Sequence, residues 1–275
     1  MSNNSNIAAI MSVYKNDKKK EVSEAINSLI NQTHPVDIFI QLDGIIDKDV
    51  FSYLKGLKFE NKIKYLGLRR VNKGLAYSLN ELLFVIRDRH SYNYVLRMDA
   101  DDISDLKRAE YQFKKMEMSS EISVCGSCIT EFNVDKKNKK QIVKYKEKDN
   151  EIKKEFCKRN AVAHVSTLIR LKDILEVNGY DESKKNEDYD LWIRMSKKGK
   201  KFYNIQRSLV MVRTSNDFYN RRKDFQRAIE VMKIKIEATK FFGCGIKGYG
   251  YAIAHFILFM SPGFVKKIIY GKLRK

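Results

Sequence analysis

The sequence predicts an α/β fold in which helices cover a largely parallel sheet. Through roughly the first hundred residues, short apolar runs alternate with segments whose apolar residues recur at helical spacing, the pattern of repeated strand–helix units. An acidic cluster, Asp99–Asp102, directly follows the fourth strand-like run, where open α/β sheets place their ligands. The length of 275 residues and the hydrophobic fraction of 43% suffice for one such domain with a packed core.

The first half of the chain is expected to contain four strands and two helices. Apolar runs predict strands at residues 7–13, 37–42, 63–68 and 94–98. After the first strand, Asn16 or Asp17 is expected to cap a helix that ends before His34-Pro35 and has an apolar stripe of Val22, Ala25, Ile26, Leu29 and Ile30. After the third strand, a helix is predicted whose apolar face is formed by Leu75, Leu79, Leu82, Leu83 and Ile86.

The second half has a less regular order of elements. Helices are predicted at about residues 106–118 and 151–158, and another is expected to start at Glu187 or Asp188. Strands are expected at about residues 124–132, 164–169, 202–205 and 209–212, with a solvated basic loop at 135–149. A long basic helix from about residue 220 to 242, a glycine-rich break and an apolar segment at 251–260 complete the chain.

The apolar segment at 251–260 has two possible placements. It is too short to cross a bilayer, which takes about twenty apolar residues. It either packs on the domain or lies in the headgroup region of an anionic membrane surface, assisted by the cations that follow it: Lys266, Lys267, Lys272, Arg274 and Lys275.

The strong positive charge indicates an anionic partner. The formal net charge of +20 is compatible with nucleic acid, an acidic membrane surface or a phosphorylated substrate, and part of the lysine excess also fits an AT-rich genome. Because the sequence contains no recognised nucleic-acid-binding motif, a nucleic-acid partner is not expected.

The four cysteines, at positions 125, 128, 157 and 244, are scattered, and no apolar leader segment precedes the first strand. Both features favour the reducing cytosol. Cys125 and Cys128 have the spacing of a redox or zinc motif, but a strand there would direct them to opposite faces, and no second pair or nearby histidine completes a metal site.

The acidic cluster has the composition of a metal site. Three carboxylates within four positions repel one another unless a cation or hydrogen-bond donors lie among them. An extended backbone would direct Asp99 and Asp101 to the same side, and hard cations such as Mn²⁺ or Mg²⁺ prefer such oxygen ligands together with substrate phosphates. The alternative is a helix cap formed by Asp102 or Ser104.

Several segments, in this order, make the chain resemble the inverting family 2 glycosyltransferases of the GT-A fold. The resemblance covers nearly the whole chain and is strongest to the bacterial branch that builds O-antigen, capsule or exopolysaccharide, including amylovoran-type enzymes. It depends jointly on Met11–Asn16, Gln32-Thr33, Asp43-Gly44, Asn72–Leu75, Arg97–Ser104 and Asn186–Met195.

The resemblance implies a fold and an organisation. The fold would be a Rossmann-like mixed sheet flanked by helices, with a C-terminal helical extension. Residues 1–215 would form the GT-A domain, with a nucleotide-binding half at 1–102 and an acceptor half at 103–215. Residues 216–275 would form a basic helical segment that packs on the domain or associates with a membrane.

The resemblance also implies roles at the donor site. Ser12, Val13 and Tyr14 would border the nucleotide, and Asp43 would accept a hydrogen bond from uracil. Asp99 would face the ribose and diphosphate and Asp101 would be the principal ligand of Mn²⁺ or Mg²⁺, while Asp102 is either a further ligand or a cap.

The catalytic base of the family corresponds to the Glu187-Asp188 pair. An inverting transfer needs a base to deprotonate an acceptor hydroxyl as it attacks the anomeric carbon opposite the departing diphosphate. Asp188 is predicted to be that base, and Glu187 is predicted to orient the acceptor or the base. The alternative is that both are acidic residues that favour the positive end of the helix dipole.

Cations are expected near the leaving diphosphate, because its charge grows as the bond breaks. Lys73, Arg97 and Arg194 are the candidates. His164 stands in a segment that resembles a family motif, and it is either a structural histidine or a ligand of the metal or diphosphate.

The predicted function is transfer of a hexose or N-acetylhexosamine from a UDP-sugar to a sugar on a polyprenyl diphosphate, in the cytoplasm at the inner face of the membrane. A metal-dependent nucleotidyltransferase is the closest alternative, since it also uses paired aspartates, but the first-strand segment lacks a Gly- or Arg-rich phosphate loop. A basic nucleic-acid-binding protein is the more distant alternative.

Overall fold

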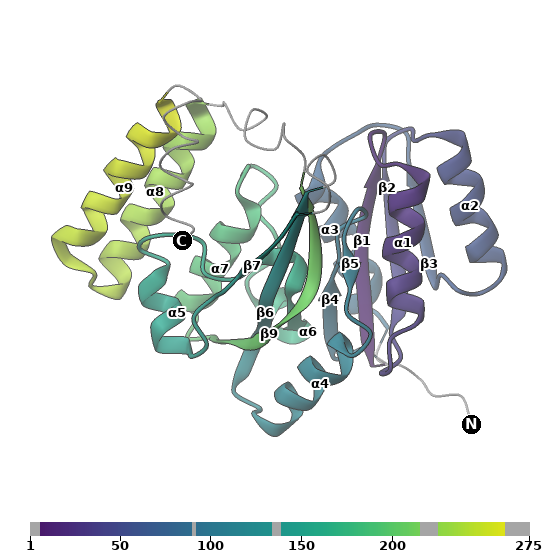
Figure 1. The fold of residues 1–275 in the computed structure, drawn as a ribbon, viewed down its shortest axis with the longest axis horizontal. Coiled ribbons are helices and arrows are strands. Elements are labelled where there is room, and N and C mark those ends of the chain that lie inside the picture. Colours follow the sequence, from purple (N-terminus) through teal and green to yellow (C-terminus); the bar gives the residue numbers. More distant parts are fainter. Residues whose placement is uncertain (1–5, 90–91, 134–138, 215–224, 262–275) are drawn as a thin grey trace.

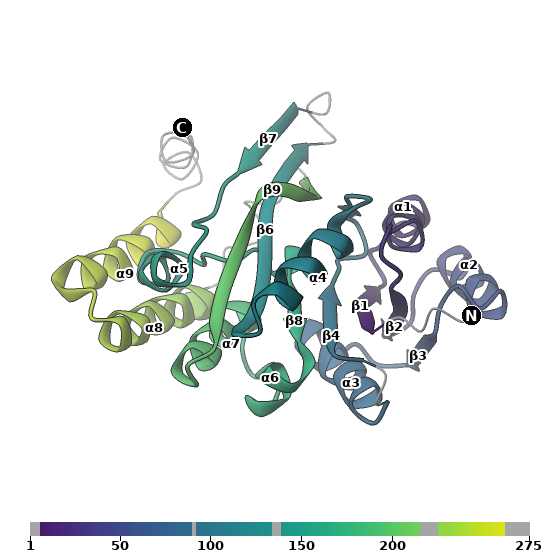
Figure 2. The same ribbon diagram turned by 90° about the horizontal axis from the view of Figure 1, so that it is seen from below.

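The computed structural model describes residues 6–89, 92–133, 139–214 and 225–261, and it is a mixed α/β structure with helices on both faces of one sheet (Figures 1 and 2). The strands are β1 (Ile7–Tyr14), β2 (Asp37–Asp43), β3 (Tyr65–Arg69), β4 (Tyr94–Arg97), β5 (Ile103–Ser104), β6 (Ile122–Asn133), β7 (Lys139–Val143), β8 (Leu168–Arg170) and β9 (Lys201–Thr214). The helices are α1 (Lys19–Ile30), α2 (Lys48–Phe59), α3 (Leu75–Arg87), α4 (Arg108–Met118), α5 (Asp149–Glu155), α6 (Leu171–Glu176), α7 (Glu187–Lys197), α8 (Phe225–Phe242) and α9 (Gly245–Met260), with a 3₁₀ turn at His164–Ser166.

The sheet has the order β3-β2-β1-β4-β8-β6-β9-β5, and β7 pairs with β6. Strands β3, β2, β1 and β4 are parallel, so the predicted parallel half is confirmed. Strand β8 is antiparallel to both β4 and β6, and β9 runs parallel to β6. The carboxyl ends of β1, β2 and β4 therefore meet along one edge of the sheet, which is where the acidic turn lies.

Each face of the sheet has its own apolar core, because side chains alternate along a strand. In β1, Ile7, Ala9 and Met11 point into the core beneath α1, α2 and α4. Ala8 and Ile10 point into the other core, which lies beneath α3, α6, α7 and α8. Burial on both faces accounts for the continuous apolar sequence of β1.

Several local predictions need correction. Helix α1 begins after Lys18 without a side-chain cap, while Asp17 accepts a hydrogen bond from Tyr14 N at 2.8 Å. The loop predicted at 135–149 contains β7, and the predicted strand at 164–169 begins as a 3₁₀ turn. The two strands predicted between 202 and 212 are one long β9 with register shifts against β6. Helix α2, capped by Asp47, was not predicted.

Two C-terminal helices pack on the domain as a hairpin. Helix α8 buries Ala228, Val231 and Ile234 toward the core, and α9 approaches α8 so closely that a Cβ on Gly248 would meet Thr239 Oγ1 at 2.4 Å. The predicted helix start at 220 lies outside the described residues. The glycine-rich break is shorter than expected, because α9 already begins at Gly245.

A disulfide joins Cys157, just after α5, to Cys244 at the junction of α8 and α9. This disulfide, between cysteines 87 positions apart, departs from the expectation that the scattered cysteines are thiols of the reducing cytosol. Cys125 and Cys128 are buried free thiols in β6. The disulfide ties the helical hairpin to the domain core.

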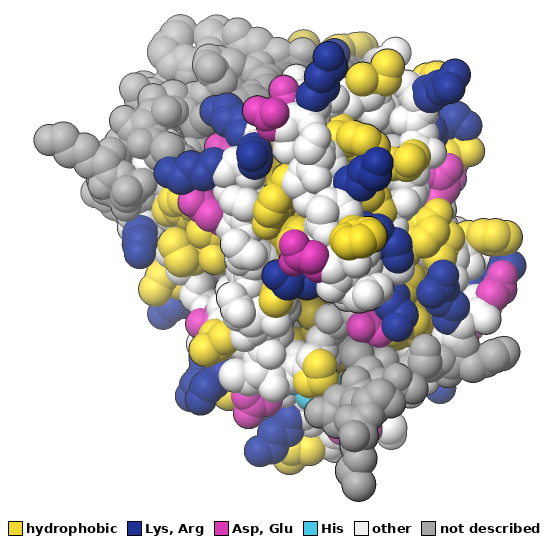
Figure 3. All heavy atoms as spheres, turned by 90° about the vertical axis from the view of Figure 1, so that its right-hand side faces the viewer, with side chains coloured by type: hydrophobic (Ala, Val, Ile, Leu, Met, Phe, Trp, Pro, Cys, Tyr) yellow, Lys and Arg dark blue, Asp and Glu magenta, His cyan; other side chains and the backbone are white. Residues whose placement is uncertain are grey.

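The cations on the face formed around α1 and α2 are dispersed. Figure 3 shows lysine and arginine side chains there interspersed with acidic and apolar ones rather than gathered in a stripe. A nucleic-acid-binding protein typically presents a continuous basic stripe. Within the parts of the chain that the structure describes, no helix is both long and apolar enough to cross a membrane.

Candidate functional site

The acidic turn lies where the sequence analysis expected it, at the carboxyl end of β4 beside the end of β1. Met98 N donates to Ile10 O at 3.1 Å, which extends the pairing of β1 and β4 up to the turn. This pairing brings the end of β1, with Ser12, Val13 and Tyr14, next to Asp99. The edge of the sheet thus gathers the predicted nucleotide-bordering segment and the predicted metal ligands.

The three aspartates of the turn have different environments. The Asp99 side chain is 40% exposed, whereas Asp102 is only 2% exposed and its Oδ1 accepts a hydrogen bond from Arg213 N of β9 at 2.8 Å. Burial and the neighbouring Asp99 raise the pKa of Asp101 to about 6. Asp102 therefore anchors β9 to the turn and does not cap the following helix, because α4 begins after Lys107 without a side-chain cap.

Further charged residues that the sequence analysis missed surround the turn. Burial raises the pKa of Asp17 to about 7, and the negative charges of Asp101, Asp99 and Glu21 add to the shift. Arg213 offsets part of this charge, because its Nε donates to Asp101 O at 2.9 Å and its Nη2 pairs with Glu24 at 2.7 Å. The only sequence signal for Asp17 was its position one turn beyond β1.

The carboxylates at this edge of the sheet can supply some, but not all, of the ligands of a hard divalent cation. Among the residues that the structure describes, no three His, Cys, Asp or Glu side chains are grouped so that they alone could hold a metal ion. Asp99 and Asp101 are close enough to raise the pKa of Asp101, and such a pair of oxygen donors fits Mn²⁺ or Mg²⁺ that takes its other ligands from a bound diphosphate and water.

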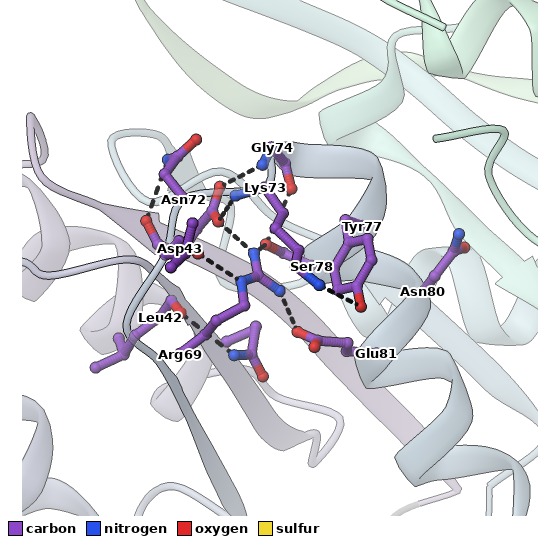
Figure 4. A network of polar contacts seen from close by, with 12 residues as sticks. Leu42, Asp43, Arg69, Asn72, Lys73, Gly74, Tyr77, Ser78, Asn80 and Glu81 are labelled. Atoms are coloured by element: carbon purple, nitrogen blue, oxygen red, sulfur yellow. Dashed lines mark hydrogen bonds and ion pairs between the residues drawn. The ribbon is translucent and has the colours of Figure 1, made fainter. Parts of the chain in front are cut away.

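Asp43 organises the loop beside the first two strands (Figure 4). It is 4% exposed, and its carboxylate pairs with Arg69 and accepts Lys73 N at 2.8 Å and Gly74 N at 3.0 Å. Arg69 also pairs with Glu81, and Lys73 Nζ donates to Tyr77 OH at 2.8 Å. The Asp43 carboxylate already accepts hydrogen bonds from Arg69, Lys73 N and Gly74 N. The predicted contact with uracil would therefore have to use the lone pairs that these bonds leave.

Arg97 connects the acidic turn to the predicted base. It is 1% exposed, its Nη2 donates to Asp99 Oδ1 at 2.5 Å, and its buried Nε has no hydrogen-bond partner among the described residues. Burial alone would lower the pKa of Arg97, but the negative charges of Asp99 and Glu187 help to raise it. One buried cation is thus close to both acidic groups of the site.

The Glu187-Asp188 pair begins α7. Asp188 Oδ1 accepts Tyr189 N at 2.8 Å, and its Oδ2 accepts Asn160 Nδ2 at 2.7 Å, so each oxygen keeps a second lone pair. Burial raises the pKa of both residues, and the negative charge of Asp188 contributes to a pKa of about 7 for Glu187. Two coupled carboxylates with raised pKa values near a cleft have the character of a general base.

His164 takes the structural role that was one of its two predicted roles. Its Nε2 shares a hydrogen bond with Tyr180 OH at 2.8 Å, and its ring meets Trp192 edge to face. Burial, together with Arg97, lowers the pKa of His164 well below its usual range, so the imidazole is neutral. The structure does not place it in a metal-holding group with Asp99 and Asp101.

Arg194, one of the three candidate cations for the diphosphate, is engaged by groups of its own domain. Its Nε donates to Asp190 at 2.6 Å, and its two terminal nitrogens donate to Val177 O at 2.6 Å and Gly179 O at 2.8 Å. These contacts fasten the turn after α6 to α7. The guanidinium therefore holds the backbone that leads to the Glu187-Asp188 pair.

Comparison with known proteins agrees with this arrangement. The model of the family "Glycosyl transferase family 2" matches residues 8–176. The amylovoran biosynthesis glycosyltransferase AmsE of Erwinia amylovora is 26% identical over 272 residues, which are 98% of this chain and 99% of that protein. The UDP-Gal:alpha-D-GlcNAc-diphosphoundecaprenol beta-1,3-galactosyltransferase of Escherichia coli is 28% identical over 227 residues, 82% of this chain and 80% of the relative.

The solved structures include the mannosyltransferase PcManGT from Pyrobaculum calidifontis in complex with GDP-Man and Mn²⁺. It aligns with a TM-score of 0.61 at 10% identity and covers 98% of this chain and 79% of its own. The mixed sheet flanked by helices is accordingly the GT-A fold that the resemblance implied. Because the family model spans more than half of the sequence, the protein belongs to glycosyl transferase family 2.

Proposed function

We propose that the protein transfers a hexose or N-acetylhexosamine from a UDP-sugar to a sugar on a polyprenyl diphosphate, with inversion, in the synthesis of a surface polysaccharide. The observation that carries this proposal is the Glu187-Asp188 pair, which is electrostatically linked through Arg97 to the acidic turn. The similarity to the Escherichia coli UDP-Gal:alpha-D-GlcNAc-diphosphoundecaprenol beta-1,3-galactosyltransferase supports the substrate classes.

In the proposed reaction, Asp188 takes the proton of the acceptor hydroxyl. The hydroxyl oxygen forms a bond to the anomeric carbon as the bond from that carbon to the diphosphate breaks, and UDP leaves on the opposite face. Asn160 holds Asp188 in place, with Nδ2 at 2.7 Å from its Oδ2, and Glu187 orients the acceptor. Ser12, Val13, Tyr14 and Asp43 border the nucleotide.

Asp101 and Asp99 would hold Mn²⁺ or Mg²⁺, which supplies positive charge to the departing diphosphate when it is bound. The carboxylates that crowd the turn support this assignment, because burial and, to a smaller extent, their mutual repulsion raise the pKa values of Asp17 and Asp101. Arg97 compensates the charge of Asp99 from the buried side. PcManGT, with the same fold, was solved with Mn²⁺ bound.

Product analysis tests the proposal. The purified protein is mixed with MnCl₂, a panel of UDP- and GDP-sugars, and N-acetylglucosamine linked through diphosphate to a short prenyl chain. We expect a disaccharide product and free UDP, with the new anomeric configuration opposite to that of the donor by NMR. A parallel reaction with UTP and a sugar 1-phosphate tests the alternative, because a nucleotidyltransferase would form a UDP-sugar there and release inorganic pyrophosphate.

We also propose that α9 lies against an anionic membrane surface on the cytoplasmic side. One face of α9 exposes the large apolar side chains Ile246, Tyr249, Ile253, Ile257 and Met260, and no acidic residue follows Glu237 in the sequence. Such a helix favours the interface between headgroups and acyl chains.

Replacing Ile253 and Ile257 together by Ser is expected to reduce co-sedimentation with phosphatidylglycerol vesicles at least about fivefold, because each buried side chain contributes roughly 1.5 kcal/mol or more. Deletion after Ser261 should also reduce it, through the lost cations. Matched substitution of exposed Phe59 on α2 by Ser serves as the control. Unchanged sedimentation of the α9 variant would contradict the placement.

A further inference from the structure

A cationic pocket lies beside the predicted base on the side of α3 and α8. It has a volume of about 350 Å³ and is lined by Lys73, Gly74, Leu75, Ala76, Glu182, Lys184, Lys185, Glu187 and Arg227. Four of these side chains are cationic and two are acidic. The acidic turn is not part of this described lining, although Lys73 and Gly74, whose backbone nitrogens donate to Asp43, connect the pocket to the nucleotide side of the site.

The loop that carries Lys184 and Lys185 is fixed at its start. Asn80 of α3 accepts Tyr180 N at 2.9 Å, and its Nδ2 donates to Tyr180 O at 2.8 Å and to Glu182 Oε1 at 2.9 Å. The Asn80 side chain therefore both accepts from and donates to the backbone of Tyr180, which fixes the first part of the loop against α3.

The same loop is fixed at its end by α8. Glu230 accepts Lys185 N at 3.2 Å and Asn186 N at 2.7 Å, and Arg227 Nε donates to Asn186 Oδ1 at 3.2 Å. A loop held in this way presents its lysines in one place, which lowers the entropic cost of binding an anion.

We infer that this pocket binds the diphosphate of the acceptor, so that the sugar attached to that diphosphate reaches Glu187 and Asp188. The inference rests on the proposed function. A diphosphate diester carries two negative charges, and the lining has two more cations than carboxylates. Lysine ammonium groups bind phosphate as point charges and arginine can donate two parallel hydrogen bonds. Glu187 on the rim places the pocket beside the base.

The UDP-sugar donor also contains a diphosphate, which could bind the same pocket. The experiment therefore distinguishes binding of the donor diphosphate from binding of the acceptor diphosphate. The variant combines Lys184→Gln and Lys185→Gln, and the matched control combines Lys48→Gln and Lys55→Gln on α2, at the far end of the molecule from α8 (Figure 1). Both lose two positive charges from exposed or partly exposed lysines. KM is measured for the donor, for the prenyl-diphosphate-linked sugar, and for the same sugar as a neutral phenyl glycoside.

We expect the KM for the diphosphate-linked acceptor to rise about tenfold in the pocket variant, while the other two KM values change less than about twofold. The control should match the unmodified protein on all three. A selective rise in donor KM would assign the pocket to the donor diphosphate instead. Equal losses on both acceptors, or no loss, would overturn the inference.

A binding measurement keeps the inference independent of catalysis. Fluorescent farnesyl diphosphate is titrated into the protein in the presence of EDTA, which removes binding through a metal at the acidic turn, and again with saturating UDP. We expect binding in both conditions and about tenfold weaker binding by the pocket variant. Absence of sugar transfer with intact binding would refute the proposed function alone, and absence of binding would refute the pocket.

Discussion

Asp188→Asn is expected to lower kcat for sugar transfer by about 10²–10⁴-fold, the usual contribution of a general base. The substitution keeps the shape of the side chain, and its single amide oxygen can still accept one of the two hydrogen bonds, from Asn160 Nδ2 or from Tyr189 N, that hold Asp188. Because Asp188 touches neither the acidic turn nor the Asp43 loop in the described contacts, donor binding should persist. Initial rates at saturating donor and UDP binding by calorimetry measure the two effects.

The control for Asp188→Asn is Glu187→Gln, which alters the other carboxylate of the coupled pair. If Glu187 only orients the acceptor, its substitution should cost roughly tenfold, mainly in the KM of the acceptor. A larger kcat loss in Glu187→Gln than in Asp188→Asn would exchange the two roles. Full activity of Asp188→Asn would remove the residue from the mechanism.

The pH profile of the unmodified protein tests the same pair. The base must be deprotonated, and the pKa of Glu187 is raised to about 7 by burial and by Asp188, whose own pKa is raised by burial. The rate should therefore fall as the pH drops through about 7, with an apparent pKa that belongs to the pair. Glu187→Gln removes one of the two charges, so the inflection should move to lower pH.

The parts of the fold that the sequence predicted are those set by local pattern. The strands β1, β2 and β4 are mainly apolar runs, and α1 and α3 have apolar residues at helical spacing. Each of these elements can therefore be predicted from its own local sequence. Strand β8 has only three residues, and β5 has two. Such short strands are defined by their partners in the sheet rather than by their own sequence.

The parts of the site that the sequence could not predict depend on contacts between distant residues. Asp102 meets Arg213 across 111 positions, and this contact, rather than a helix cap, engages its carboxylate. Asp43 is held by Arg69, 26 positions away, and Arg194 is occupied by carbonyl groups of the turn after α6. Motif resemblance identified the segments, but it did not indicate which side chains in them are already bonded.

Asp101→Asn is expected to abolish transfer and, unlike Asp188→Asn, to abolish metal-dependent UDP binding as well. Asp101 supplies one of the two oxygen groups available to Mn²⁺ or Mg²⁺, and the remaining ligand Asp99 is already paired with Arg97 at 2.5 Å. The loss in affinity for UDP in the presence of Mn²⁺ should be about 100-fold or more, and the metal-free affinity should be nearly unchanged.

Thermal unfolding of the same variant gives an independent readout. Burial and Asp99 raise the pKa of Asp101 to about 6. At pH 7.5 Asp101 is therefore ionised in the folded, metal-free protein, although its surroundings disfavour the charge, and this destabilises the folded state. Asp101→Asn should therefore raise Tm without metal and remove the further rise that Mn²⁺ with UDP gives the unmodified protein. The exposed Asp105→Asn, with the same change in charge, is the matched control. A variant that still gains stability from Mn²⁺ and UDP would show that the metal is held elsewhere.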